Sequence, residues 1–136
     1  MIEETVISDL DGKRSPSALT SQMYRLAGFV TEIVERNLTP ILKRDLFGFA
    51  DHLSYIDSKI LVFTQSTSAS NHSARVKKVA ANEHARDLCH AGHVVEVVSW
   101  KKKKVRKLKK DGTPSKLFYV QYEGRVSQFE ADDFTC

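Results

Sequence analysis

The sequence predicts an α+β protein in which a helical N-terminal part of about three helices precedes a C-terminal antiparallel β meander. Apolar residues recur at helical spacing through the first ninety residues, whereas β-branched and aromatic residues dominate after Gly92. Turn-forming residues are dense at positions 111–115. We therefore expect a mainly helical part over residues 1–92 and a β meander with a lysine-rich hairpin over residues 93–136.

The first two predicted helices have recognisable starts. Ser15-Pro16-Ser17 is a helix-start signal, because Ser caps helix N-termini and Pro is favoured in the first turn. Apolar residues then trace one helical stripe over residues 18–37. Thr39-Pro40 has the same cap-and-proline form and starts a second predicted helix over residues 40–57, in which Gly48 is an unfavourable residue.

The middle of the chain contains a short apolar run, a loop and a third helix. Residues 59–64 fit either a buried strand or a continuation of the preceding helix, since periodicity cannot separate the two at this length. Residues 65–72 are rich in Ser, Thr and Asn, which is typical of a loop. Residues 73–89 predict a third helix, which Gly92 closes.

The C-terminal part is expected to form three strands. Residues 93–100 are β-branched and end at a Trp, and residues 117–122 and 125–130 are the other two predicted strands. A basic run and turn residues at positions 111–115 connect the first two strands, and Glu123-Gly124 is interpreted as the second turn.

The charge of the chain is unevenly distributed. The formal net charge is +4, and residues 94–136 carry all of it, since residues 1–93 contain equal numbers of basic and acidic side chains. Eight of the ten residues at positions 101–110 are Lys or Arg. So dense a run requires counter-charge, and nucleic-acid phosphates supply it through counterion release.

Several classes of protein are excluded or disfavoured. The sequence has no run of about 18 apolar residues, as a membrane-spanning helix requires, and its acidic N-terminus lacks the order of a secretory signal. Two cysteines cannot form a disulfide framework, so we expect an intracellular location, cytoplasmic or nucleoid/nuclear. The phosphate-binding, zinc-protease and serine-hydrolase motifs are missing.

The basic run is predicted to be one strand and the tip of a β hairpin. In an extended strand alternate side chains share a face, which puts Lys102, Lys104, Arg106 and Lys110 on one side and Lys103, Lys107 and Lys109 on the other. The excess of Lys over Arg favours phosphate contacts over base readout. The predicted nucleic-acid-binding residues are Lys101, Lys102, Lys103, Lys104, Arg106, Lys107, Lys109, Lys110, Lys116 and Arg125, with Trp100 or Tyr119 as a ring on which bases stack.

The C-terminal residues also resemble a known type of domain. The C-terminal residues comprise a strand ending at Trp100, a basic strand, the aromatic stretch 117–122, a Glu-Gly turn and the segment Asp132-Asp133-Phe134. In this order they resemble the Tudor and SH3-like small β-barrels. That resemblance implies either recognition of methylated residues in an aromatic cage or nucleic-acid binding. The lysine run would repel a cationic peptide, so the resemblance points to nucleic acid.

No cofactor, metal site or catalytic residue is predicted. His84, Cys89, His90 and His93 are residues of ligand type, but their spacing places only Cys89 and His93 on one helix face. A small enzyme that uses His84 and Cys89 is a third hypothesis, although no further residue completes a catalytic set.

The leading hypothesis is a nucleic-acid-binding accessory or regulatory protein with low sequence specificity, for DNA or RNA, that makes mainly phosphate contacts. The alternative is an interaction module or inhibitor whose basic hairpin grips an acidic partner protein. The N-terminal helices suggest a homodimer, because three short helices bury little surface alone. We expect no interaction with a membrane.

Overall fold

A computed structural model describes the whole chain except residues 9, 11, 41 and 58. In this part of the chain the strands are β1 (Ile2–Ser8), β2 (Val30–Ile33), β3 (Arg36–Asn37), β4 (Lys43–Arg44), β5 (His52–Tyr55), β6 (Leu61–Ser68), β7 (Val94–Leu108) and β8 (Pro114–Gln128). The helices are α1 (Pro16–Leu26), the short 3-10 helix η1 (Ala69–Asn71), α2 (His72–Ala80) and α3 (Glu83–His90).

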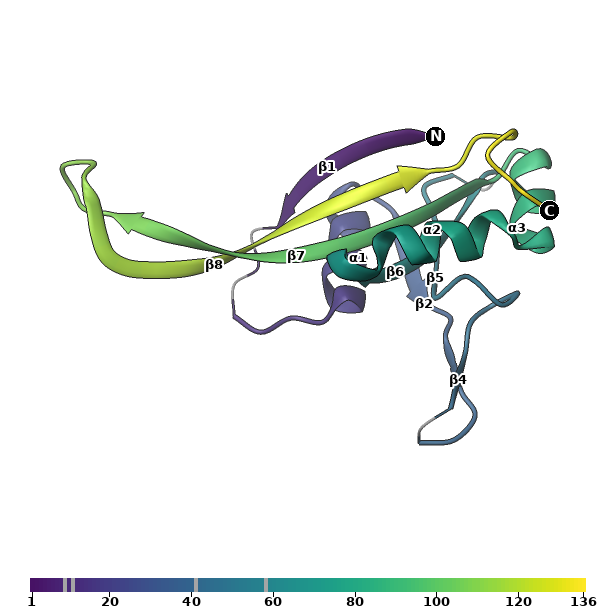
Figure 1. Cartoon of the computed structure of the whole chain (residues 1–136), viewed down its shortest axis with the longest axis horizontal. Coiled ribbons are helices and arrows are strands. Elements are labelled where there is room, and N and C mark those ends of the chain that lie inside the picture. Colours follow the sequence, from purple (N-terminus) through teal and green to yellow (C-terminus); the bar gives the residue numbers. More distant parts are fainter. Residues whose placement is uncertain (9, 11, 41, 58) are drawn as a thin grey trace.

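A single large mixed sheet organises the protein. Among the described residues, six strands form it in the order β1-β8-β7-β6-β5-β2, while β3 and β4 pair separately as a short arm (Figure 1). Strands β6 and β7 are parallel, and η1, α2 and α3 connect them. The other neighbouring strands of this sheet pair antiparallel.

Helices cover both faces of the sheet. On one face Val79, Ala80 and Ala85 of α2 and α3 pack in one buried cluster with Phe63 and Val95 of β6 and β7. On the other face α1 packs through Leu19 in a second cluster, which also contains Val98, Trp100, Tyr122 and Val126. Because neighbouring residues of a strand point to opposite faces, β7 supplies Val95 and Val97 to one cluster and Val98 and Trp100 to the other.

The predicted fold class is therefore wrong. The chain is mostly β, and its C-terminal strands are not a separate SH3-like or Tudor-like meander, since β7 pairs with β6 and β8 pairs with β1. The sheet thus joins residues on both sides of the expected boundary at residue 92. The predicted start of α1 is confirmed, because the helix begins at Pro16 and the Ser15 hydroxyl accepts a hydrogen bond from the Ala18 N–H at 3.2 Å.

The predicted helix over residues 40–57 does not form. This segment contains β4, a tight turn and β5, and the turn places Phe47 and Gly48 at φ values of 54° and 78°. Such angles are incompatible with a right-handed helix. The apolar spacing that resembled a helix instead puts Phe49 and Ala50, directly after the turn, in the core.

The other two predicted helices are shorter than expected. Helix α1 ends at Leu26, and Gly28 at φ 91° turns the chain into β2. Residues 73–89 divide into α2 and α3, because the Asn82 side chain caps a new helix by accepting from the Ala85 N–H at 3.0 Å. From Leu61 the apolar run at 59–64 is the strand β6, which continues through the first half of the expected loop to Ser68.

The predicted turn at Glu123-Gly124 is also wrong, since β8 runs straight through it. Gly124 is required by packing rather than by a turn. A Cβ atom at this position would lie 2.7 Å from Trp100 Cζ3 and 2.7 Å from Val6 Cγ2. Glycine therefore lets the Trp100 ring lie directly against the backbone of β8.

Candidate nucleic-acid interface and polar cleft

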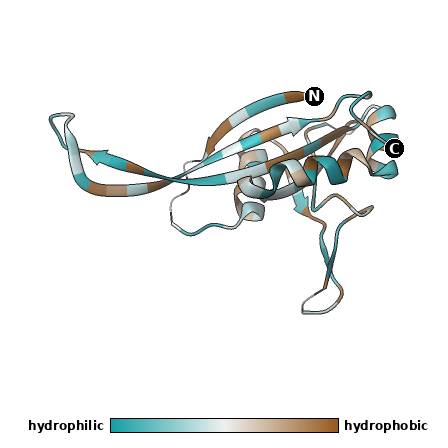
Figure 2. Cartoon of the chain, in the orientation of Figure 1, coloured by the Kyte–Doolittle hydropathy of each residue, from teal (hydrophilic) through white to brown (hydrophobic). Residues whose placement is uncertain are grey.

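Strands β7 and β8 continue well beyond the sheet as a two-stranded ribbon (Figure 1). The pairing of β7 with β6 ends at Trp100, and the pairing of β8 with β1 begins at Tyr122. We therefore call residues 101–121 the ribbon. It contains nine basic residues and one acidic residue, Asp111. Figure 2 shows hydrophilic residues along the outer part of β7 and a hydrophobic stretch on the outer part of β8.

The strand register assigns the cations to faces. One face carries Lys102, Lys104 and Arg106, as the alternation predicted; their cross-strand partners are Tyr122, Val120 and Phe118. The opposite face carries Lys101 and Lys103, and here Glu123 is the cross-strand partner of Lys101 and forms an ion pair with Lys103. The first face therefore holds three cations without a carboxylate opposite them.

The remaining predicted contacts are distributed unevenly. A register shift between Arg106 and Leu108 interrupts the alternation at Lys107. Lys109 and Lys110 lie in the tip of the ribbon and Lys116 on β8, and all three are exposed. Arg125 lies outside the ribbon and is engaged by Glu3, whose carboxylate accepts from Arg125 Nε at 3.1 Å.

Only one of the two predicted stacking rings is accessible. Trp100 is 5% exposed, and its indole N–H donates to the Thr20 hydroxyl at 2.9 Å, so it is a core residue. Tyr119 is 40% exposed. Phe118 is also exposed on the ribbon, with the Arg106 guanidinium 5.0 Å from its ring centre.

A polar cleft that the sequence did not predict opens beside the base of the ribbon. Its volume is about 630 Å³. The first turn of α1, the end of the β3–β4 arm, the start of β5, the end of β6 and one side of α2 supply its walls. Its charged lining residues are Glu35, Asp45, Asp51, Lys43, Arg44, Arg75 and Lys78.

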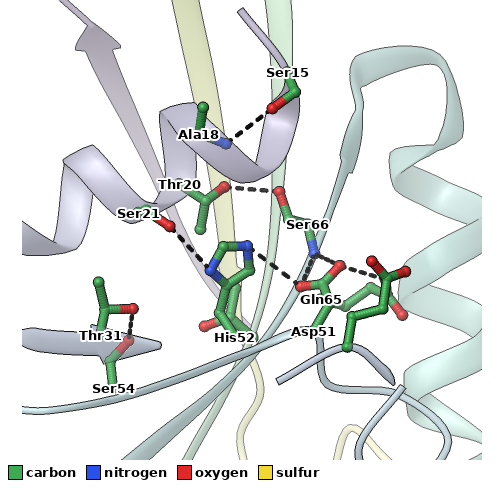
Figure 3. A network of polar contacts seen from close by, with 12 residues as sticks. Ser15, Ala18, Thr20, Ser21, Thr31, Asp51, His52, Ser54, Gln65 and Ser66 are labelled. Carbon is green, nitrogen blue, oxygen red and sulfur yellow. Dashed lines mark hydrogen bonds and ion pairs between the residues drawn. The ribbon is translucent and has the colours of Figure 1, made fainter. Parts of the chain in front are cut away.

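Asp51 is the buried acid of this cleft (Figure 3). Its carboxylate accepts from the Ser66 backbone N–H at 3.0 and 3.1 Å and from the Gln65 side-chain amide at 3.2 Å. Lys78 Nζ donates to Gln65 Oε1 and to Asp45 Oδ2, each at 3.4 Å. Asp51, Gln65, Lys78 and Asp45 thus form one connected chain of polar contacts.

The surroundings make ionisation of Asp51 costly. Burial raises the pKa of Asp51 to about 7, and the nearby carboxylates of Asp45 and Glu35 act in the same direction against the stabilising Ser66 N–H. A carboxyl group that titrates near neutrality in a cleft has the properties of a general acid or base.

The neighbouring His52 is fully buried and neutral near pH 7. Burial lowers the pKa of His52 to about 4, and the positive charge of Arg25 adds to this effect. His52 Nε2 lies 3.7 Å from Asp51 Oδ1, too far for a hydrogen bond, and it has no hydrogen-bond partner among the described residues. The Asp51 carboxylate is therefore buried against an imidazole that carries no compensating charge.

The cleft and the ribbon lie at the same end of the sheet. Ser66 of the cleft pairs in parallel register with Val98, and Ser68 pairs with Trp100, the residue before the ribbon. The Asp51 N–H donates to the Thr64 carbonyl at 2.9 Å, and this bond holds the start of β5 beside the same part of β6.

The histidine and cysteine cluster singled out in the sequence shows no comparable organisation. Within the described residues, no group of three or more His, Cys, Asp and Glu side chains is arranged to hold a metal ion. Burial raises the pKa of the Cys89 thiol, which disfavours the reactive thiolate. His84 packs against Phe47, with ring centres 5.6 Å apart.

Comparison of the chain with known protein families, with characterised proteins and with solved structures found no match. In the described part of the chain, no helix is long and apolar enough to cross a membrane.

Proposed function

We propose that this protein binds nucleic acid through the ribbon, as an accessory or regulatory protein with low sequence specificity. The observation that carries the proposal is the extended form of the ribbon, whose two strands and tip carry nine cations and extend past the helices (Figure 1). Such a ribbon fits along a groove or a phosphate backbone. Eight of the nine cations are lysines, which bind phosphates as point charges and read few base edges.

The test is a titration by fluorescence anisotropy against single- and double-stranded DNA and RNA at about 50 and 200 mM salt. The variant carries Gln in place of Lys101, Lys102, Lys103 and Lys104. We expect affinity that falls steeply with salt and is lost in this variant. Absence of binding by the parent protein at the lower salt concentration contradicts the proposal.

The alternative function is the binding of an acidic partner protein by the ribbon. The same cations serve it. The homodimer is a separate proposal that rests on the N-terminal helices, and one of its premises, a helix over residues 40–57, is absent. A pull-down with and without nuclease separates the two functions. Partners that are lost after nuclease treatment reach the protein through nucleic acid, whereas partners that remain bind it directly.

A second candidate function is hydrolysis of the phosphodiester bonds of the bound nucleic acid. The observation that favours it is the buried Asp51 in a cleft lined by four cations, at the end of the sheet from which the ribbon extends. In such a step a water oxygen bonds to phosphorus, the bond from phosphorus to one sugar oxygen breaks, and the leaving oxygen takes a proton. Asp51 is placed to take the proton of the water, or to share a Mg²⁺ ion with the substrate phosphate, since Mg²⁺ commonly uses only one or two protein carboxylates.

Incubation of end-labelled DNA and RNA with the protein tests this activity, in Mg²⁺, in Mn²⁺ and in EDTA. Cleavage by the parent protein that Asp51→Asn abolishes supports the candidate, provided that the variant still binds the substrate. Absence of product under all three conditions contradicts the candidate and leaves the binding proposal unaffected.

A further inference from the structure

The short arm formed by β3 and β4 carries an unfavourable pair of charges. Arg36 and Arg44 are direct cross-strand partners, so their side chains leave the same face of the arm. Both residues are exposed, and no ion pair joins either of them to another described residue. Like charges directly opposite one another destabilise a strand pair, and an anion bound between them would reverse that effect.

The two arginines also border a small cavity. Its volume is about 200 Å³, and Arg36, Arg44 and Asp45 line it together with the apolar Val34, Leu46 and Phe47. The Asp45 carboxylate is already engaged by Lys78. The cavity therefore combines two guanidinium groups with an apolar wall.

Phe47 is the aromatic part of that wall, and its backbone conformation is unusual. It has φ 54°, and the turn that contains it is closed by a hydrogen bond of 3.2 Å from the Phe49 N–H to the Leu46 carbonyl. Positive φ at this position of a tight turn favours Asn, Asp or Gly, so an aromatic residue there is strained. The Asn82 side chain stabilises the turn by donating to the Phe47 carbonyl at 3.1 Å.

Core packing leaves part of the Phe47 ring exposed to solvent. It contacts His84, with ring centres 5.6 Å apart, and Phe63, with ring centres 6.3 Å apart, yet the residue is 48% exposed. A strained backbone that presents an exposed ring is typical of a functional position. Exposed rings of this kind are platforms on which nucleobases stack.

We propose that Arg36, Arg44 and Phe47 form a subsite for one nucleotide of a single strand. Its phosphate lies between the two guanidinium groups, which bind phosphate through paired hydrogen bonds, and its base stacks on the Phe47 ring. This inference rests on the proposed function, because it assumes that the protein binds nucleic acid. It adds to the cations of the ribbon a separate site at which an unpaired base can stack between charged groups that hold its phosphate.

The experiment compares a labelled oligo(dT) with a duplex of equal length by anisotropy. Phe47→Ala is expected to weaken oligo(dT) binding by about 5- to 150-fold, the range for the loss of one stacked base, and to change duplex binding by less than about twofold. Phe47→Tyr retains the ring and is expected to bind like the parent. Arg36→Gln with Arg44→Gln is expected to weaken oligo(dT) binding without removing any ring. The matched control is Leu42→Ala, an exposed apolar residue of the arm.

Phe47→Trp gives a direct signal of stacking. Oligo(dT) is expected to quench the fluorescence of the new indole, whereas the parent protein, whose single tryptophan Trp100 is buried, is expected to show little change. This readout also guards against misfolding of Phe47→Ala, since Trp keeps the ring contacts.

The outcomes separate the two proposals. If the parent protein binds neither oligonucleotide, the proposed function fails and the subsite fails with it. If the parent binds both, but the Phe47 and arginine variants match it and the indole is not quenched, only the subsite is refuted.

Discussion

The salt dependence of binding should come mainly from one face of the ribbon. Lys102, Lys104 and Arg106 share that face and have no acidic cross-strand partner. On the opposite face Glu123 offsets the charge of Lys101 and Lys103. The perturbation is therefore a triple variant in which Gln replaces Lys102, Lys104 and Arg106.

The structure gives the size of the effect. Each phosphate contact contributes about 0.9 to the slope of log K against log salt for duplex DNA, so the loss of three contacts reduces the slope by about 2.7. Between about 50 and 200 mM salt, the affinity of the parent protein should then fall by about 40-fold more than that of the variant.

The assay is anisotropy with a labelled duplex at several salt concentrations. The matched control replaces Arg25, Lys59 and Lys77 with Gln. These residues are exposed and lie outside the ribbon, and the change in net charge is the same. The control is expected to change the slope by less than about one. An unchanged slope in the ribbon variant, or an equal change in both variants, refutes the assignment of phosphate contacts to this face.

Three further predictions concern stability. Gly124→Ala should lower Tm by several degrees in a thermal melt, because the new Cβ would overlap the Trp100 ring, and overpacking costs about 1–3 kcal/mol; an unchanged Tm contradicts this packing. Asp51→Asn should stabilise the protein above pH 7 by up to about 4 kcal/mol, because the raised pKa of Asp51 makes the folded state lose stability as pH rises from 3.8 through about 7. In urea titrations this gain should vanish at pH 4, and a gain independent of pH opposes the mechanism. His52→Gln should flatten the loss of stability as pH falls from 6.5 to about 4, since the lowered pKa of His52 means that mainly the unfolded state takes up a proton in that range; an unaltered pH profile contradicts it.

Local signals in the sequence predicted several boundaries correctly. Ser15-Pro16 starts α1, Gly92 follows the last helix at φ 96°, and the first three of the turn residues at 111–115 lie between β7 and β8, while the last two begin β8. Each of these signals acts through the backbone of its own few residues, so it needs no tertiary context.

The errors arose where tertiary packing determines the structure. Over residues 40–57 the apolar residues at helical spacing belong instead to a tight turn and to β5, an internal strand of the sheet, and Phe49 and Ala50 are buried between the turn and β5. In the sequence Gly124 resembles a turn residue, whereas in the structure the Trp100 ring packs against it. Neither feature can be recognised from local propensity alone.

The candidate sites were predicted to different extents. The cations of the ribbon are contiguous in sequence, so their density was visible without a structure. The cleft combines Glu35, Asp51, Gln65 and Lys78, which lie on four different segments, so no spacing motif could reveal it. One signal of the cleft in the sequence was Gln65, a polar residue directly after the apolar run, which is buried in β6. A buried polar side chain in such a strand requires partners, and here the partners are Asp51 and Lys78.

The most direct test of the account removes the ribbon itself. A two-residue Asn-Gly turn in place of residues 103–121 would join Lys102 to its cross-strand partner Tyr122 and leave the sheet and both buried clusters in place. We predict that this variant keeps the cooperative unfolding of the parent protein but loses nucleic-acid binding at about 50 mM salt. Binding of the folded variant with the affinity of the parent would contradict the central claim.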